Sequence, residues 1–339
     1  MTTQLDFPNG VFLSDRTAAP RIGFLFPGQG SPANLGGGIY RHRFDAARHL
    51  YATAGLPESG EAVATDVAQP AIVTASLVGL RALSELGVQA GVAVGHSLGE
   101  LTALHWAGVF DEAALRRIAR VRGKAMAELG NPTGTMAAIA ASWQEVHVLL
   151  NGDPVSVVGY NSPQQTVIAG EVEAVKAVAG RAQQRGWRST NLRVSHAFHT
   201  PLVSAATPIL AAQLAKETFH PAEQPVISTI TGAPLNPHEN LRQLLCRQVT
   251  SPVRFMDALG IAAPEVDLWI EVGPGQALTG LAREGQSKPV IALDAGGESL
   301  LGLWLVAGAA FALGAPVQRA ALYRGRFTRP FHIEWQPKF

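Results

Sequence analysis

Short apolar runs that end at glycine or proline alternate along the chain with longer stretches of helical spacing. Residues 21–26 form such a run and stop at 27–30, Pro-Gly-Gln-Gly, which predicts a buried strand followed by a tight turn. Residues 68–87 predict a helix that begins at Gln69-Pro70, and residues 91–95 predict a second short strand. This alternation predicts an α/β fold.

The same pattern continues toward the C-terminus. Residues 111–129 predict a helix with acidic residues in its first turn and a stop at the glycine that follows. Residues 226–229 and 268–272 predict further strands of the same sheet, separated by helix. Residues 301–314 are the longest apolar stretch, which is too short to span a bilayer and predicts a buried helix.

Two stretches near the N-terminus predict no regular element. Residues 1–20 contain Pro8, Gly10 and Pro20 without a sustained period, and we expect a leader or linker there. The run at 36–38 consists of three glycines, but it lacks the ending of a P-loop and the spacing of a dinucleotide fingerprint. A flexible turn is the interpretation we adopt for it.

Residues 134–195 have a different rhythm, which predicts a small domain. They predict, in order, a strand at 136–140, a helix at 143–150, strands at 155–160 and 165–169, a helix at 173–185 and a strand at 189–194. This βαββαβ order is the ferredoxin-like pattern. We therefore expect a ferredoxin-like small domain, residues 134–196, inserted into a large domain formed by residues 21–133 and 197–298.

Composition limits the partners and the chemistry. The chain has 339 residues, of which 47% are hydrophobic and 16% charged, as in a globular protein. A net charge of +1 gives no general drive toward nucleic acid or an anionic membrane, so we expect neither as a partner. Cys246 is the single cysteine, which excludes an internal disulfide and a multi-cysteine metal site. We expect no metal site, no secretion signal and a cytoplasmic location.

Ser97 is the candidate nucleophile. It stands in Gly95-His96-Ser97-Leu98-Gly99, which matches the G-x-S-x-G pattern of a nucleophile elbow, a tight turn here between a predicted strand and a predicted helix. Such a turn needs glycine on both sides because the serine backbone is strained and a β-carbon there would meet neighbouring main chain. The alternative is an ordinary turn serine.

A serine hydroxyl needs a base, and spacing alone does not select one of the ten histidines. His96 is adjacent to the serine. His196 and His199 fall together in Ser195-His196-Ala197-Phe198-His199-Thr200. At this point the candidates remain open.

The sequence resembles the malonyl-CoA:acyl carrier protein transacylase family, which includes the acyltransferase domains of polyketide and fatty acid synthases. The resemblance rests on blocks that arrive in family order between residue 21 and about residue 295. These blocks are Phe26-Pro27-Gly28-Gln29-Gly30-Ser31, Gln69-Pro70-Ala71, Gly95-His96-Ser97-Leu98-Gly99-Glu100, Arg122-Gly123-Lys124-Ala125-Met126, Asn161-Ser162-Pro163, His196-Ala197-Phe198-His199, Arg247-Gln248, Ser251-Pro252-Val253 and Glu271-Val272-Gly273-Pro274-Gly275. One departure is Pro32, where the family commonly has glutamine.

The resemblance implies the fold and the catalytic groups. It implies an α/β-hydrolase-like large domain with a parallel sheet, malonyl-CoA as donor substrate and no tightly bound cofactor. It implies that His199 is the base and that the main-chain carbonyl of Gln248 orients it. The oxyanion hole would be formed by the backbone amides of Gln29 and Leu98.

Arg122 is the residue that narrows the substrate in this resemblance. A malonyl group ends in a carboxylate, and burying that charge is costly unless a guanidinium pairs with it. The alternative is a solvated arginine like Arg116, Arg117 and Arg120 on the same predicted helix. We expect the ligand role.

Further site residues follow from the matching motifs. In polyketide acyltransferases a His-Ala-Phe-His motif goes with malonyl, which implies that the ring of Phe198 fills the space of an α-methyl branch. The alternative for Phe198 is a core aromatic. We also expect Gln69, His96 and Asn161 to bind the substrate.

The resemblance also implies the partners. The acceptor would be the phosphopantetheine arm of an acyl carrier protein, and other polyketide synthase domains would be neighbours. Arg185, Arg188 and Arg193 are expected either to form a basic rim for the acidic carrier or to be a solvated face. Residues 299–339 are expected to be a C-terminal helix and a post-acyltransferase linker. The sequence of residues 95–106 resembles that of iterative synthases of the enediyne kind.

Two other functions share some of these features. A serine hydrolase or editing thioesterase would use the same elbow but release the acyl group to water. A non-catalytic docking domain of a synthase would keep the fold without the chemistry. The carboxylate clamp expected at Arg122 favours the transferase, because a general esterase has little use for it.

Overall fold

The computed structural model describes residues 4–16, 18–58 and 63–325. Within these ranges, six strands form the central sheet, in the order β10-β9-β4-β3-β11-β12. The strands are β3 (Ile22–Phe26), β4 (Val92–Gly95), β9 (Val226–Ser228), β10 (Ala233–Pro234), β11 (Leu268–Glu271) and β12 (Val290–Ala292). The pairs from β9 through β12 are parallel, but β10 runs antiparallel to β9. The expected all-parallel sheet is therefore wrong at this edge, because a tight turn after β9 returns the chain at once.

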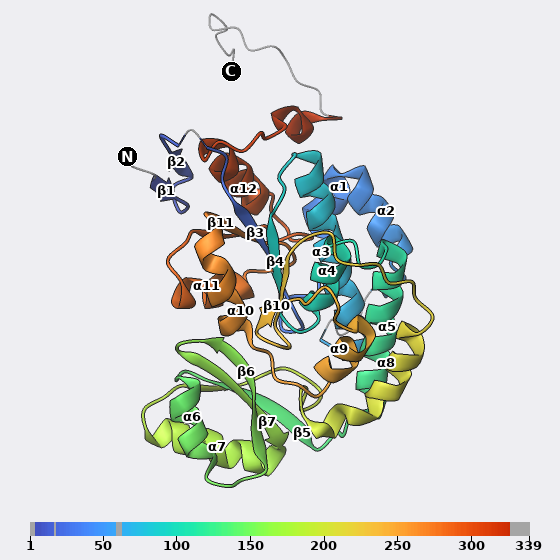
Figure 1. Ribbon diagram of the computed structural model, residues 1–339, viewed down its shortest axis with the longest axis vertical. Coiled ribbons are helices and arrows are strands. Elements are labelled where there is room, and N and C mark those ends of the chain that lie inside the picture. Colours follow the sequence, from blue (N-terminus) through green and yellow to red (C-terminus); the bar gives the residue numbers. More distant parts are fainter. Residues whose placement is uncertain (1–3, 17, 59–62, 326–339) are drawn as a thin grey trace, which may run out of the picture.

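Helices cover both faces of this sheet (Figure 1). Alternate residues of β3 show why, since Phe24 and Phe26 join one core and Leu25 joins the other. The helices of this part are α1 (Gly38–Arg43), α2 (Asp45–Thr53), α3 (Thr65–Glu85), α4 (Gly99–Trp106), α5 (Glu112–Leu129), α8 (Thr207–Leu214), α9 (Leu241–Gln248), α10 (Phe255–Ala262), α11 (Ala277–Gly285) and α12 (Leu301–Ala312). Three 3₁₀ helices complete it, η1 (Pro201–Ala206), η2 (Ala263–Glu265) and η3 (Arg319–Tyr323).

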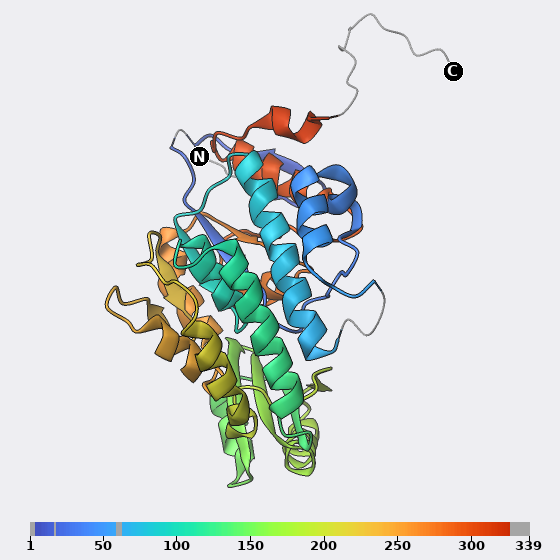
Figure 2. The same ribbon diagram turned by 90° about the vertical axis from the view of Figure 1, so that its right-hand side faces the viewer.

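Helix α3 begins earlier than its sequence indicates. It starts at Thr65, so Pro70 lies inside the helix and not at its first turn. An interior proline removes one helix hydrogen bond, and α3 packs along α5 over its length (Figure 2). α3 is also the one described helix that is long and apolar enough to cross a membrane, but most of it is buried inside the protein. Burial in the core explains its composition.

A separate antiparallel sheet forms the lower part of the molecule in Figure 1. Its elements follow the chain as β5 (Gly134–Ile139), α6 (Trp143–Leu150), β6 (Val155–Ser162), β7 (Gln165–Glu171), α7 (Val172–Gln184) and β8 (Ser189–Asn191). The strand order is β6-β7-β5-β8. All the elements expected here are present, although β8 ends three residues earlier than expected.

The N-terminal hairpin lies beside α12, near the C-terminal end of the described chain (Figure 1). Residues 1–20, expected to be a linker, contain the hairpin of β1 (Gln4–Asp6) and β2 (Val11–Leu13). Phe12 of this hairpin lies against Gly308, where an added β-carbon would come within 2.8 Å of its ring. The buried helix expected at 301–314 is present as α12. Leu301 and Phe311 are exposed, however, so only one face of α12 is buried. The part of the expected linker from 326 onward lies outside the described residues.

The glycine run at 36–38 is a packed turn and not a flexible one. Gly37 and Gly38 have φ angles of 75° and 47°, which favour glycine. A β-carbon on Gly38 would lie 2.1 Å from the carbonyl oxygen of Gly297. The run therefore packs α1 against the segment that follows β12.

Candidate active site

Ser97 lies in a sharp turn between β4 and α4. Its φ angle is 51°, a left-handed value that is uncommon for a residue with a side chain. The flanking glycines are required, since a β-carbon on Gly99 would lie 2.0 Å from the carbonyl oxygen of Phe26 and one on Gly95 would lie 2.4 Å from main-chain atoms of α4. The turn therefore has the geometry that the G-x-S-x-G pattern predicts.

His199 is the histidine that contacts the serine. Its Nε2 lies 2.9 Å from the Oγ of Ser97, and its Nδ1 lies 3.0 Å from the carbonyl oxygen of Gln248. A carbonyl can only accept, so Nδ1 carries the proton and Nε2 is free to accept from the serine hydroxyl. The neutral ring is therefore held in the tautomer that a general base needs.

The other two candidate histidines have different partners. His96 Nε2 lies 2.9 Å from Asn161 Oδ1, and His196 Nδ1 lies 2.8 Å from the hydroxyl of Ser195. The Asn161 amide donates to the side chain of Gln165 at 2.9 Å, so its oxygen faces His96. His96 therefore serves to join the elbow to β6, and spacing alone could not have separated it from His199.

Burial and a neighbouring cation together set the charge of His199. Burial in the site lowers the pKa of His199, the positive charge of Arg122 lowers it further, and the resulting pKa is about 3. The imidazole is therefore neutral at physiological pH, with its lone pair available to the hydroxyl of Ser97.

Gln248 contributes a second contact that the sequence did not reveal. Its side-chain Nε2 donates to the carbonyl oxygen of Ser97 at 2.8 Å, while its own carbonyl accepts from His199. One residue thus supports both the strained backbone of Ser97 and the ring of His199. No local pattern around Gln248 indicates this, because its position depends on α9 packing beside the elbow.

Arg122 lies on α5 with only 2% of its surface exposed. Its NH1 donates to Gln69 Oε1 at 2.9 Å and its NH2 reaches the Oγ of Ser97 at 3.4 Å. No carboxylate in the described chain forms an ion pair with it, and its Nε has no hydrogen-bond partner there. Burial lowers the pKa of Arg122 to about 10, which still leaves it charged at neutral pH. A buried cation without a counter-ion is costly, and it is poised to accept an anion.

These groups line one narrow cavity of about 60 Å³. Its lining residues are Gln29, Gln69, His96, Ser97, Arg122, Met126, Met136, Val158, Gly159, Asn161, Val167, Val194, Phe198, His199 and Val253. The apolar ones come largely from the small sheet and from the segment that leads back from it. The cavity therefore lies between the two sheets.

Glu100, in the first turn of α4, packs behind the elbow. The sequence motifs did not indicate a functional role for it. It is fully buried, and it accepts from the backbone N–H of Thr229 at 3.0 Å and from the hydroxyl of Ser228. Burial raises the pKa of Glu100 to about 7, although these hydrogen bonds oppose the shift. The residue ties the first turn of α4 to the end of β9.

Comparison with known proteins places this geometry in a family. The acyl transferase domain family matches residues 23–325. This chain belongs to that family. The malonyl CoA-acyl carrier protein transacylase of Escherichia coli (strain K12) is 35% identical over 284 residues, which cover 78% of this chain and 92% of the relative. The family expected from the sequence motifs is therefore confirmed.

Two further similarities connect this acyltransferase with polyketide synthases. The crystal structure of the acyltransferase domain of an iterative polyketide synthase in enediyne biosynthesis is 36% identical, with a TM-score of 0.83, and the match covers 96% of this chain and 78% of that one. The polyketide synthase GfsA of Streptomyces halstedii is 32% identical over 351 residues. That match covers 92% of this chain but only 5% of the synthase.

The remaining expected residues of the acyltransferase lie near the serine, and their roles stay predictions. Gln29 and Phe198 line the cavity, and Leu98 is buried at the residue before α4. The turn that carries Gln29 approaches the elbow closely, because a β-carbon on Gly28 would lie 2.4 Å from the His96 carbonyl oxygen. Pro32, the departure from the family, is not among the residues that line the cavity.

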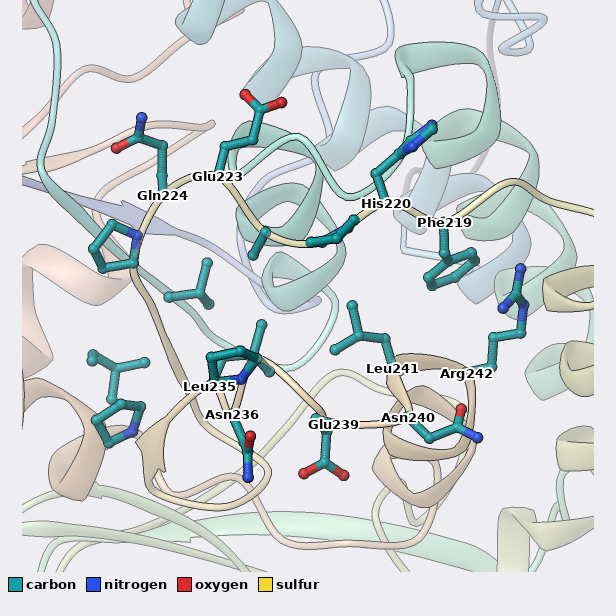
Figure 3. Close-up of a pocket in the computed structure, with 17 residues that line it drawn as sticks. Phe219, His220, Glu223, Gln224, Leu235, Asn236, Glu239, Asn240, Leu241 and Arg242 are labelled. Atoms are coloured by element: carbon teal, nitrogen blue, oxygen red, sulfur yellow. The ribbon is translucent and has the colours of Figure 1, made fainter.

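A larger cavity, of about 720 Å³, lies elsewhere in the acyltransferase (Figure 3). It is lined by residues from segments 219–227 and 234–242, and Arg242 at its edge donates to the carbonyl of Leu214 at 3.0 Å. None of its lining residues lines the serine cavity. Within the described ranges, no cluster of metal-ligating side chains was found either. The volume of a cavity alone therefore does not identify the candidate active site.

Proposed function

We propose that this acyltransferase moves a malonyl group from malonyl-CoA, through an ester on Ser97, to the phosphopantetheine thiol of an acyl carrier protein in polyketide biosynthesis. The observation that carries the proposal is the buried guanidinium of Arg122, unpaired by any described carboxylate and 3.4 Å from Ser97 Oγ. A substrate carboxylate would supply the missing counter-ion. Relatives named malonyl CoA-acyl carrier protein transacylase support the same donor and acceptor.

In the first half-reaction, Ser97 Oγ attacks the thioester carbonyl of malonyl-CoA while His199 Nε2 takes its proton. The carbonyl oxygen becomes negative in the tetrahedral intermediate, and the backbone amides of Gln29 and Leu98 would donate to it. The C–S bond then breaks, and the proton on His199 passes to the leaving thiolate. Coenzyme A leaves as a thiol and malonyl remains as an ester on Ser97.

In the second half-reaction, the carrier thiol replaces coenzyme A. His199 takes the thiol proton, the sulfur attacks the ester carbonyl, and the C–O bond to Ser97 breaks. The proton on His199 returns to Ser97 Oγ. The site is restored, and this chain's own residues supply every group, so the mechanism needs no tightly bound cofactor.

The malonyl carboxylate would also strengthen the base. The positive charge of Arg122 is one cause of the low pKa of His199. A carboxylate bound to that guanidinium neutralises the repulsion, so the pKa of His199 rises when malonyl-CoA binds. Recognition of the donor and activation of Ser97 would thus be linked.

The finer description of the fold is part of the proposal. The order β6-β7-β5-β8 and the βαββαβ succession support a ferredoxin-like small domain. The strand–turn–helix at Ser97 supports an α/β-hydrolase-like large domain built from residues 21–133 and 197–298. Residues 299–339 would belong to the junction with a following domain.

The proposed partners are an acyl carrier protein and the other domains of a polyketide synthase, in the cytoplasm. The exposed side chains of Arg185, Arg188 and Arg193 on the small domain support a basic rim for an acidic carrier. Arg185 already lies over the ring of Trp187, 5.5 Å from its centroid. The 36% identity with the enediyne-synthase domain supports the iterative subtype.

Intact-protein mass spectrometry with malonyl-CoA tests the proposal. We expect a malonyl adduct on the wild type, none on Ser97→Ala, and transfer of labelled malonyl to a carrier protein. Rapid release of free malonate without loading of the carrier would replace the transferase with a hydrolase. A wild type that forms no adduct would indicate a docking domain.

The steric role proposed for Phe198 has its own test. Phe198→Ser should increase the rate of acylation by methylmalonyl-CoA relative to malonyl-CoA, because the ring no longer fills the cavity beside the α-carbon. An unchanged ratio would leave Phe198 with a packing role only.

A further inference from the structure

A continuous row of hydrogen bonds leads from Arg122 to the protein surface. Arg122 NH1 donates to Gln69 Oε1 at 2.9 Å, and Gln69 Nε2 lies 3.2 Å from Gln29 Oε1. Gln29 Nε2 donates to Thr65 Oγ1 at 2.9 Å, and Thr65 Oγ1 lies 2.9 Å from the hydroxyl of Ser195. We call these four residues, Gln69, Gln29, Thr65 and Ser195, the amide–hydroxyl chain.

The direction of the amide–hydroxyl chain follows from its charged end. A guanidinium can only donate, so Gln69 must turn its oxygen toward Arg122 and its NH₂ toward Gln29. Gln29 must then offer its oxygen to Gln69 and its NH₂ to Thr65. In the arrangement that uses every proton, the hydroxyl of Thr65 donates to Ser195. Hydrogen bonds aligned in this way polarise one another.

Thr65 is the residue on which this alignment depends. It is 1% exposed, while Ser195 is exposed to solvent. Its backbone is also fixed, because a β-carbon on Gly123 of α5 would lie 2.8 Å from the Thr65 carbonyl oxygen. The side chain of Gln29 is therefore bonded to a rigid point beside Arg122, and not to a mobile surface group.

We propose that Thr65 is a positioning residue for donor specificity: its hydroxyl fixes the two glutamine amides that hold Arg122 toward Ser97. Without this acceptor, the amide of Gln29 loses a partly buried hydrogen bond, and the oxygen of Gln69 is no longer held toward the guanidinium. Thr65 thus acts through Gln29 and Gln69 and touches no substrate. This inference depends on the proposed role of Arg122 as the clamp for a malonyl carboxylate.

The test compares Thr65→Val with Thr65→Ser, using acylation of Ser97 by malonyl-CoA and by acetyl-CoA. Valine keeps the shape of threonine but removes the hydroxyl, and we expect the malonyl-to-acetyl ratio of kcat/KM to fall about tenfold. The loss should be mainly an increase in KM for malonyl-CoA. Thr65→Ser retains the hydroxyl and should restore the ratio to within about twofold.

Thr74→Val is the matched control. Thr74 lies on the same helix and is equally buried, but its hydroxyl donates to the carbonyl of Pro70 at 2.8 Å, outside the amide–hydroxyl chain. We expect an unchanged malonyl-to-acetyl ratio. An equal fall in Thr74→Val, or an equal loss with both donors in Thr65→Val, would reduce Thr65 to a structural residue and overturn the proposal.

Double substitution provides a check that does not depend on one variant alone. Gln29→Met breaks the same hydrogen bond from the other side and keeps the main-chain amide. Adding Thr65→Val to Gln29→Met should change the ratio by less than about twofold, because the bond is already lost. Additive losses would contradict the link. If wild type forms no malonyl adduct, the proposed function fails; if it does and Thr65→Val has the wild-type ratio, only this inference fails.

Discussion

The small antiparallel sheet and the site around the elbow differ in how far their residues adopt the backbone conformations and pairings that they prefer. In the small sheet, α6 begins with a complete capping box between Ser142 and Glu145, and Asn151, a residue that tolerates left-handed backbone, ends it. At the elbow, Ser97 and His199 both have positive φ, and Arg122 is a buried cation without a counter-ion in the described chain. One region satisfies its local preferences, while the other violates several of them.

The difference agrees with the proposed chemistry, in which local stability is given up around Ser97 and Arg122. Unfavourable backbone and unpaired polar groups persist only where surrounding structure holds them. Here Gln248 holds the serine carbonyl, and the amide–hydroxyl chain holds the guanidinium. The small sheet needs no such support and contributes the apolar wall, including Val158 and Val167.

Arg122→Met should have the largest effect on the contrast between the two regions, because it removes the unpaired charge from the site. We expect kcat/KM for malonyl-CoA to fall about 100- to 1,000-fold, since the carboxylate of the donor loses its buried partner. The kcat/KM for acetyl-CoA, which has no such carboxylate, should fall far less. The free protein should melt at a higher temperature, because a desolvated cation has been replaced by an apolar side chain.

The control for that variant is Lys124→Ala. Lys124 is an exposed cation on the same helix, paired loosely with Glu128 at 3.7 Å. The kcat/KM for either donor should change by no more than about twofold in Lys124→Ala. Equal losses for malonyl and acetyl in Arg122→Met would remove the clamp from the mechanism.

Gln248→Met tests the support of the strained nucleophile. The main-chain carbonyl that accepts from His199 is kept, but the donor to the Ser97 carbonyl is lost. We expect kcat to fall about tenfold with either donor, corresponding to about one buried hydrogen bond. Single-turnover acylation measures this directly. Unchanged acylation would mean that the turn holds Ser97 without help.

The pH dependence of acylation by acetyl-CoA reports on His199. Because the charge of Arg122 contributes to the low pKa of His199, Arg122→Met should raise that pKa toward, but not to, the ordinary value, since burial remains. The acid limb of kcat/KM must then move to higher pH. A limb that stays in place would show that the two groups do not interact.

Ser142→Ala has the smallest expected effect and belongs to the regular region. Loss of its cap on α6 should lower the free energy of unfolding by about 1 kcal/mol. Acylation rates should match those of the wild type, because Ser142 lies outside the cavity. A marked loss of acylation would show that the small sheet contributes more than a wall.

Local signals were enough for much of the fold. The elements between β5 and β8 and the helix expected at 111–129, which is α5, agree with their sequence patterns, because periodicity and helix ends are set within one or two turns. The antiparallel strand β10, the hairpin at the N-terminus and the start of α3 were not foreseen. β10 and the N-terminal hairpin pair with strands only a few residues away, so the missed signals were local turns. The start of α3, by contrast, packs against α5, which is distant in sequence.

For the site, the residue pattern by itself determined the elbow, with Ser97 between two obligatory glycines, and the family motifs added His199 and Arg122. Only the tertiary structure decided that His96 bonds to Asn161 while His199 contacts Ser97. It also decided that Gln248 bonds both to the Ser97 carbonyl and to the His199 ring, and that Thr65 joins the amides behind Arg122. The physical reason is the distance along the sequence over which each interaction acts. Backbone preference and capping are properties of neighbouring residues, whereas hydrogen bonds among groups 36 to 151 positions apart exist only once the helices and both sheets have packed.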